Sequence, residues 1–266
     1  MNSILVLVDL TPTAAISTEQ AIHLAKYKGA EITLSYIAQN KEEAGSEELQ
    51  KKLKPYTTKL DDQEIKYTIH IGTGDYKTEV PEYVKAHRPD LVIVGTHGKK
   101  GLKQKWFGSA IYALIKSIPA TTLVISDFTA TKGKGFSKIL LPVAAHDNYL
   151  LKVKQSCEVL APNGTIVVFN IVKPGTPVSD KISNNILATK EYLTAENVDF
   201  VIENVESTTF SVGYSRETLD YVSKNKVDLI SIMTRVADNS GAVSSDVDKE
   251  NILLNVEGVP VLCANR

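Results

Sequence analysis

The sequence predicts an α/β protein built from two tandem domains. Each domain is expected to be a doubly wound, mostly parallel five-stranded sheet with helices on both faces. Two observations favour this fold class: strand and helix signals alternate through the first half of the chain, and the same order of signals then restarts. Parallel strands that alternate with helices need right-handed crossovers, which produce a doubly wound sheet.

The strands expected in the first half are short apolar or alternating runs. The apolar run at 4–8 is typical of a strand buried on both faces. At 65–71 apolar residues alternate with polar ones, and this period of two indicates a half-exposed strand near a sheet edge. The strands of this half are expected at 4–8, 32–38, 65–71, 91–94 and 121–125.

The helices between these strands are predicted from apolar residues at helical spacing. Gly29 is expected to cap the first helix, because glycine adopts the left-handed conformation that ends many helices. Pro55 is expected to kink or divide the second helix, because proline cannot donate a backbone hydrogen bond. The helices are expected at 14–28, 49–60, 80–87 and 109–117.

The second half of the chain repeats the first. The segment "SILVLVDL" is followed by "SKILLPVA" at 137–144, and "YKTEVPEYVKAHRPDLVIV" by "YSRETLDYVSKNKVDLISI" at 214–232. The predicted domains are therefore 1–128 and 137–266, joined by a polar, glycine-containing linker at 129–136. Their last strands are apolar edges, which tend to be paired, so we expect the domains to pair through them as an intramolecular pseudo-dimer. A further homodimer is left open.

Composition and charge exclude several function classes. The chain has 266 residues and a net charge of −1, so it lacks the basic field typical of nucleic-acid binders. No apolar run reaches the roughly 20 residues needed to span a bilayer, and the start has no secretory signal. Cys157 and Cys263 lie far apart in apolar contexts, so no disulfide or metal site is expected. These features favour a cytoplasmic protein without a membrane partner.

Residues at two strand ends suggest a ligand site. In an open parallel sheet, ligands bind outside the carboxyl ends of the strands, where the strand order reverses. Asp9 closes the first strand, and Gly95 is expected to turn the chain sharply off the fourth strand into the segment "VGTHGKKGLKQKWFGSA". Backbone N–H groups near Gly98 and at the helix that begins with Ser109 would favour phosphates. Asp9 is better suited to a ribose hydroxyl.

The glycines of this segment resemble the nucleotide-binding signature of universal stress proteins. The matching spacing is Gly95-x-x-Gly98, followed by nine residues and then Gly108-Ser109. An aspartate that closes the first strand and a glycine that follows the third strand (Gly72) also agree, and the resemblance covers essentially the whole chain as a tandem pair. It implies an adenine nucleotide alpha-hydrolase-like fold that binds ATP, with Mg²⁺ on the phosphates left open. The implied nucleotide-binding residues are Asp9, Ile37, Gly72, Gly95, Gly98, Gly108, Ser109 and Ala110. Ile37 would lie toward the adenine ring.

The second half departs from this signature. Asp9 aligns with Ala144, Gly95 with Met233 and Gly98 with Val236. The corresponding loop carries acidic residues that would repel a triphosphate, namely Asp238, Asp246, Asp248 and Glu250. We therefore expect the second domain to keep the fold without the nucleotide site. A cation held by the acidic loop is an open alternative.

The expected function is that of an ATP-binding stress-response or regulatory protein. Nucleotide in the N-terminal domain alone would bias the surface recognised by an unidentified regulatory protein partner. The alternative is a slow ATP hydrolase or nucleotidyl transferase, although His-x-Gly-His, Ser-Gly-Gly-x-Asp-Ser and Walker-type motifs are absent. No catalytic residue is assigned. A flavin-binding electron-transfer module is a third interpretation, which colourless protein would exclude.

Overall fold

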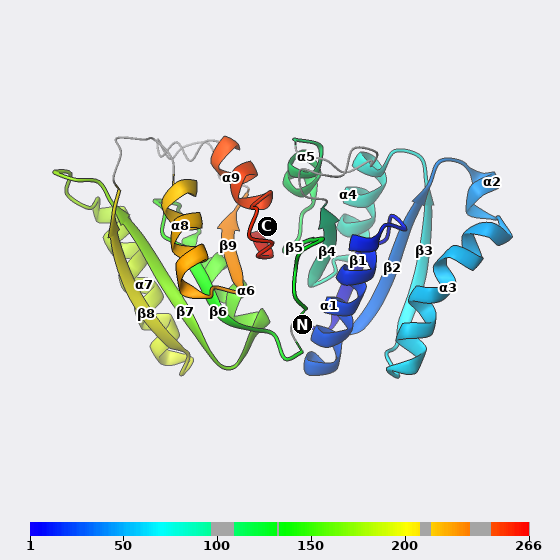
Figure 1. Ribbon diagram of the computed structural model, residues 1–266, viewed down its shortest axis with the longest axis horizontal. Coiled ribbons are helices and arrows are strands. Elements are labelled where there is room, and N and C mark those ends of the chain that lie inside the picture. The colour runs from blue at the N-terminus through cyan, green and yellow to red at the C-terminus, as the bar shows by residue number, and fades with distance from the viewer. Residues whose placement is uncertain (97–108, 132, 208–213, 235–245, 266) are drawn as a thin grey trace. The chain divides into compact units, whose positions relative to one another are not determined.

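The computed structural model describes residues 1–96, 109–131, 133–207, 214–234 and 246–265. The chain divides into two compact units (Figure 1). The first unit is Met1–Lys134 together with Asn265, and the second unit is Gly135–Ala264. Each is an α/β unit with a parallel sheet, as the alternating pattern predicts. None of the helices in the described part of the chain combines the length and apolarity needed to cross a membrane.

The sheet of the first unit has the strand order β3-β2-β1-β4-β5, and its strands pair in parallel. The order reverses between β1 and β4, so the carboxyl ends of these two strands meet at the switch point. β3 lies at the edge of this order, with Ile69 41% exposed, which confirms the half-exposed edge strand. The strands are β1 (Ser3–Leu7), β2 (Glu31–Ala38), β3 (Tyr67–Thr73), β4 (Leu91–Thr96) and β5 (Thr122–Ser126).

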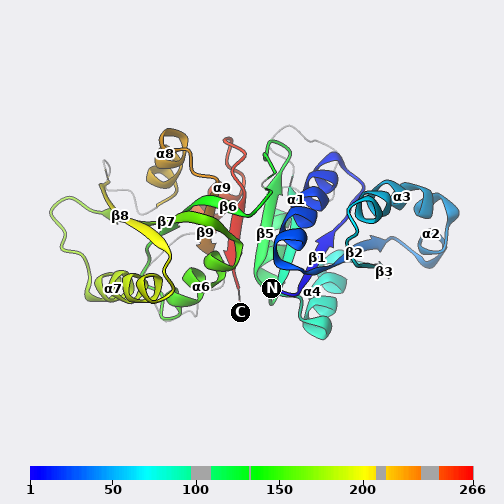
Figure 2. The ribbon, with the colours of Figure 1, turned by 90° about the horizontal axis from the view of Figure 1, so that it is seen from below.

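Helices cover both faces of this sheet. Figure 2 shows α1 and α3 on one side and α4 on the other. Gly29 caps α1 with a φ of 71°, as predicted. α3 continues through Pro55 as one helix, and the short α2 has too few residues to show a periodic pattern. The helices are α1 (Pro12–Lys28), α2 (Lys41–Ala44), α3 (Glu47–Asp62), α4 (Tyr76–His87) and α5 (Ser109–Ser117).

The second unit repeats this arrangement, with the strand order β10-β9-β6-β7-β8. Its strands are β6 (Phe136–Pro142), β7 (Leu160–Val172), β8 (Asp199–Glu206), β9 (Leu229–Met233) and β10 (Val261–Ala264). Its helices are α6 (Tyr149–Val159), α7 (Asp180–Ala195), α8 (Ser215–Asn225) and α9 (Asp246–Leu253). α6 packs on α7, and α8 packs on α9. β6 therefore has the central position that β1 has in the first unit.

The amino edges of the two sheets are built alike. Asp90, just before β4, accepts hydrogen bonds at Oδ2 from the backbone N–H groups of Asn2 (2.6 Å) and Ser3 (3.1 Å). Asp228, just before β9, accepts from the N–H groups of Ser137 (3.0 Å) and Lys138 (2.8 Å). Each aspartate thereby ties the loop before one central strand to the start of its neighbour.

A second pair of equivalent hydrogen bonds shows which residues of the two units correspond at the carboxyl edges of their sheets. The Val8 N–H donates to the Ser35 carbonyl, and the Val143 N–H donates to the Phe169 carbonyl, both at 2.8 Å. The residue after Val8 is Asp9, and the residue after Val143 is Ala144. Asp9 and Ala144 therefore occupy equivalent positions.

Candidate functional site

The turn between β1 and α1 places Asp9 at the carboxyl end of β1. Thr11 donates to Asp9 Oδ1 from its backbone N–H (3.1 Å) and from its hydroxyl (2.5 Å). Thr11 is also the N-cap of α1, and Pro12 follows as the first helical residue. The carboxylate is therefore held in place at the switch point by the start of the helix. Our sequence interpretation did not include Thr11, although a threonine-proline pair before a helix is a recognisable cap signal.

Gly95 lies inside β4, opposite Ile125 of β5. A Cβ atom at this position would be 3.0 Å from Thr13 Cγ2 and 3.3 Å from Ser17 Oγ, both on α1. The prediction that Gly95 turns the chain off the strand is wrong, because its φ is not positive and β4 continues to Thr96. The missing side chain instead lets α1 pack directly against the end of β4.

Ile37 and Gly72 face each other on β2 and β3. A Cβ atom on Gly72 would be 2.8 Å from Ile37 Cδ1, so the isoleucine side chain fills that space. Gly72 was expected to follow the third strand, but it is the second-last residue of β3. Glycine interrupts the alternation of apolar and polar side chains. The alternating pattern therefore predicted a strand that ends at residue 71, whereas β3 ends at Thr73. Its effect is to let the Ile37 side chain lie flat over the neighbouring strand.

The remaining predicted residues lie around the start of α5. Ser109 is the first residue of this helix, and Ala110 is the second and is half-buried. The first N–H groups of a helix lack intrahelical partners, so the start of α5 offers donors to an anion. Gly98 and Gly108 lie outside the described residues, as do the lysines between them.

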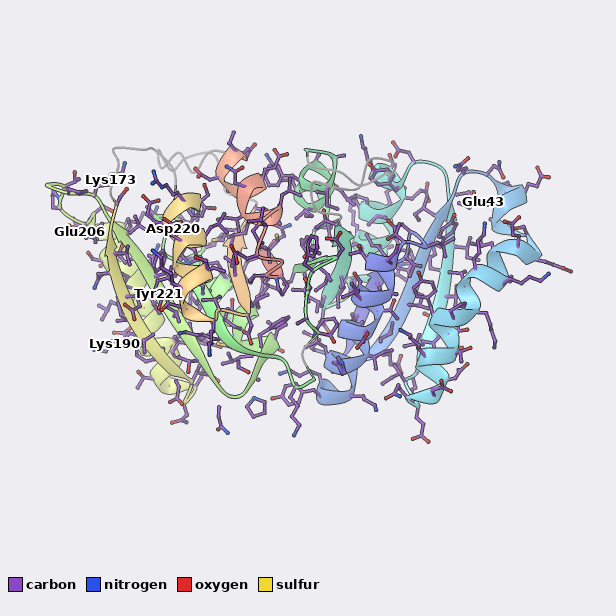
Figure 3. All side chains as sticks on the ribbon, in the orientation of Figure 1. Glu43, Lys173, Lys190, Glu206, Asp220 and Tyr221 are labelled. Carbon is purple, nitrogen blue, oxygen red and sulfur yellow. The ribbon has the colours of Figure 1, made fainter. Side chains whose placement is uncertain are left out.

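Two tyrosines that our sequence interpretation missed lie near Asp9. The Tyr36 hydroxyl donates to Glu43 Oε1 (2.6 Å), and Glu43, labelled on α2 in Figure 3, accepts from the Gln39 N–H at Oε2 (2.7 Å). Burial, the bond to Glu43 and the charge of Asp9 raise the pKa of Tyr36 above its usual value. Burial and then Asp9 raise the pKa of Tyr56. Both phenols therefore stay neutral and can only donate or accept hydrogen bonds beside the carboxylate.

The equivalent edge of the second unit is filled by the protein's own side chains. Asn185 on α7 donates to the carbonyl oxygens of Ala144 (2.8 Å) and His146 (3.2 Å), and so covers the turn that corresponds to the Asp9 turn. Met233 stands in the place of Gly95 and is 7% exposed. Lys152 lies eight residues after Ala144, as Ser17 lies eight residues after Asp9, so the two correspond in sequence. Lys152 is buried and donates from Nζ to the Pro142 carbonyl (2.6 Å).

Two basic groups at this edge have strongly lowered pKa values. Burial lowers the pKa of Lys152 to about 7. Burial, followed by the nearby charges of Lys152, Lys249 and Lys181, lowers the pKa of His146 to about 4. His146 is therefore neutral near pH 7, and Lys152 is partly deprotonated there.

The prediction that Asp246, Asp248 and Glu250 lie in a loop is wrong, because they belong to helix α9, where Asp248 makes a structural contact. Asp248 accepts hydrogen bonds at Oδ1 from the backbone N–H (3.1 Å) and the hydroxyl (2.5 Å) of Ser215. Within the described ranges, no group of three His, Cys, Asp or Glu side chains could hold a metal ion, and Asp238 lies outside them. Cys157 and Cys263 form no disulfide within the part of the chain that the structure describes.

Comparisons with known proteins agree with this architecture. The sequence profile of the universal stress protein family matches residues 1–126. No curated protein matches the sequence. The profile match covers the strands and helices that carry Asp9, Ile37, Gly72 and Gly95.

Solved structures resemble the chain in fold. A universal stress protein from Archaeoglobus fulgidus is 14% identical, with a TM-score of 0.73 over 100% of this chain and 96% of its own. A functionally unknown protein from Pseudomonas aeruginosa is 16% identical, with a TM-score of 0.66 over 100% and 92%. A universal stress protein family member from Arabidopsis thaliana, solved with AMP bound, is 19% identical, with a TM-score of 0.36 over 47% and 92%. Residues 1–126 of this chain thus match the universal stress protein family, and the whole chain shares its fold with a solved universal stress protein.

Proposed function

We propose that the first unit binds an adenine nucleotide, with ATP as the expected ligand, and that the chain acts as a stress-response or regulatory protein. The observation that carries this proposal is the Asp9 carboxylate, held by Thr11 at the carboxyl end of β1. β4, the neighbouring strand across the switch point, leads toward α5. An acceptor for hydroxyl groups and a helix start that favours anions are thus supplied from the same edge of the sheet.

In this proposal each part of a nucleotide is assigned to residues of the first unit. The Asp9 carboxylate would accept hydrogen bonds from the ribose hydroxyls, and the end of β2 near Ile37 would lie beside the base. The phosphates would bind the backbone N–H groups of Gly98, Gly108, Ser109 and Ala110. Mg²⁺, where present, would be held mainly by the phosphates.

The second unit is proposed to bind no nucleotide. Ala144 supplies no acceptor in place of Asp9, and Asn185 already occupies the carbonyl oxygens of that turn. The buried Met233 side chain stands where the first unit has Gly95, which lies directly against Thr13 and Ser17 of α1. These contacts support a structural role for the second unit.

A regulatory role follows from the placement of the site. Nucleotide at the start of α5 would favour one conformation of the connection between β4 and α5, and a partner protein could distinguish the two states. No described residue favours the alternative of a slow hydrolase or nucleotidyl transferase. ATP turnover above about 1 s⁻¹ would contradict the regulatory proposal.

Isothermal titration calorimetry with ATP tests the site. Asp9→Asn keeps an amide oxygen that can accept from Thr11, but it loses the negative charge to which the ribose hydroxyls would donate. The affinity of this variant for ATP should therefore fall about tenfold. The matched control is Asp90→Asn, at the opposite edge of the same sheet, which should bind ATP like the unmodified chain. Equal affinity of both variants would overturn the assignment of Asp9, and two ATP molecules per chain would overturn the second-unit proposal.

A second titration separates the phosphates from the nucleoside. The double variant Gly98→Val with Ser109→Ala should weaken ATP binding while adenosine binds as it does to the unmodified chain. An equal loss for ATP and adenosine would contradict the phosphate assignment. Mass spectrometry of nucleotide released from the purified protein would identify the resident ligand.

A further inference from the structure

A cavity of about 550 Å³ opens between α1 and α3, beside the turn that carries Asp9. The two helices lie on the same side of the first sheet (Figure 2). This volume falls within the range of roughly 300–1,000 Å³ that is usual for small-molecule sites. The residues that line it are Leu10, Ala15, Lys52, Pro55, Tyr56 and Lys59.

The walls of this cavity are mainly apolar. Tyr56 is 8% exposed and presents its ring, because its hydroxyl donates to the Thr11 carbonyl (3.4 Å). Leu10 adopts a φ of 63°, a left-handed conformation that is uncommon for a branched side chain. Glycine would adopt this conformation without strain but would leave the cavity without that wall. Leu10 thus supplies an apolar wall of the cavity although its left-handed backbone conformation is unfavourable for leucine.

The rim of the cavity carries two lysines on one face of α3. Lys52 and Lys59 are seven residues apart, which is close to two helical turns. Lys52 Nζ lies 2.6 Å from Glu48 Oε1, so this lysine already has an anionic partner. Among the residues that the structure describes, Lys59 forms no ion pair. Its ammonium is therefore the cation available to a ligand.

We propose that this cavity binds a small amphipathic anion, namely a carboxylate with an aliphatic or aromatic body. The apolar body lies against Leu10, Ala15 and Tyr56, and the carboxylate pairs with Lys59. A nucleotide is a poor fit, because these walls offer few hydrogen-bond partners to a base or a ribose. Leu10 directly follows Asp9, so the ligand would touch the same turn that holds the proposed ribose acceptor.

Titration of ¹⁵N-labelled protein with decanoate, followed by NMR, tests this proposal without any nucleotide. Decanoate should shift the amide signals of Ala15, Tyr56 and Lys59, and decanol should shift the same signals with weaker affinity. Lys59→Gln should weaken decanoate binding by about fivefold to tenfold and leave decanol binding unchanged, because only the ion pair is lost. The matched control is Lys54→Gln, an exposed lysine on another face of α3, which should bind both as the unmodified chain does.

A second variant tests the cavity itself. Ala15→Leu places a larger side chain in the cavity and should remove binding of both decanoate and decanol, while a dispersed spectrum shows that the protein is folded. The proposal is overturned if Lys59→Gln binds decanoate as tightly as Lys54→Gln does. It is also overturned if the decanoate shifts map away from the cavity or persist unchanged in Ala15→Leu. Because ATP is absent from the sample, these outcomes are independent of the nucleotide proposal.

Discussion

The ammonium group of Lys152 lies 2.6 Å from the carbonyl oxygen of Pro142, the last residue of β6. Lys152 corresponds to Ser17 of the first unit, a buried residue whose hydroxyl has no hydrogen-bond partner in the described structure. The first unit therefore has two small residues, Ser17 and Gly95, where the second has Lys152 and Met233. The two units share a fold but differ in how much space their own side chains fill at equivalent places.

The first prediction concerns Lys152 and pH. Its pKa is about 7 in the folded protein, against an ordinary value of 10.5. Between these values the unfolded chain binds more protons, so the contribution of Lys152 to stability rises with pH and is smallest below pH 7. The stability of the unmodified chain relative to Lys152→Met should therefore increase by roughly 1–2 kcal/mol from pH 7 to pH 9.

Labelling of Cys263, which is buried in β10, can report unfolding of the second unit in a Cys157→Ser background. Urea titrations at each pH would compare Lys152→Met with Lys154→Met, an exposed lysine on the same helix. Only Lys152→Met should change the pH dependence. Parallel pH profiles for the two variants would show that Lys152 does not titrate between pH 7 and pH 9.

The second prediction concerns the contact of Gly95 with α1. Gly95→Ala should destabilise the protein by about 1–2 kcal/mol, because its Cβ would lie 3.0 Å from Thr13 Cγ2. Thr13→Ser removes that methyl group and keeps the hydroxyl, so it should restore most of the loss in the double variant. A double-mutant cycle from urea unfolding measures this coupling. Gly133→Ala, with no atom within 4 Å of its Cβ, is the neutral control, and strictly additive effects would contradict the proposed contact.

The strands, the Gly29 cap and the edge position of β3 could be predicted because they depend on local patterns. Apolar periodicity is set by a residue and its near neighbours in sequence. The switch-point position of Asp9 followed from the fold rule for open parallel sheets, which β1 and β4 obey as neighbours. The match of residues 1–126 to the universal stress protein family agrees with the resemblance that the glycine spacing suggested.

The roles of Gly72 and Gly95 could not be predicted, because each depends on which distant side chain meets the missing Cβ atom. Ile37 meets Gly72 across two strands, and Thr13 meets Gly95 from a helix. The bonds of Asn185 to the turn after β6 are likewise tertiary contacts that join segments about 40 residues apart in sequence. Sequence patterns specify the secondary structure, whereas these contacts depend on how its elements pack.

The third prediction concerns two helix ends. Arg88 ends α4 with φ 48° and ψ 55°, and Lys226 ends α8 with φ 51° and ψ 40°. Glycine adopts this conformation without the Cβ clash, although it also loses more entropy on folding. Arg88→Gly and Lys226→Gly should therefore each raise the free energy of unfolding by about 0.5–1 kcal/mol in urea titrations. Alanine keeps the Cβ atom, so equal stabilisation by Arg88→Ala would contradict the backbone explanation.

The last prediction is an acid sensitivity of the second unit that arises at His146. Burial and the charges of Lys152, Lys249 and Lys181 lower its folded pKa to about 4, from an ordinary value of 6.5, and the opposing charge of Asp147 is weaker. A lowered pKa means that the unfolded chain binds the proton first as pH falls. The stability that His146 contributes is therefore complete above about pH 6.5 and is lost progressively as the pH falls toward 4.

His146→Asn removes the titrating ring, so this variant should lose about 1–2 kcal/mol less stability than the unmodified chain between pH 7 and pH 5. Urea unfolding followed by Cys263 labelling measures the difference in the second unit. His87→Asn, an exposed histidine at the end of α4, is the matched control and should leave the acid profile of the second unit unchanged. If His146→Asn and His87→Asn lose the same stability between pH 7 and pH 5, then protonation of His146 is not what destabilises the second unit in acid.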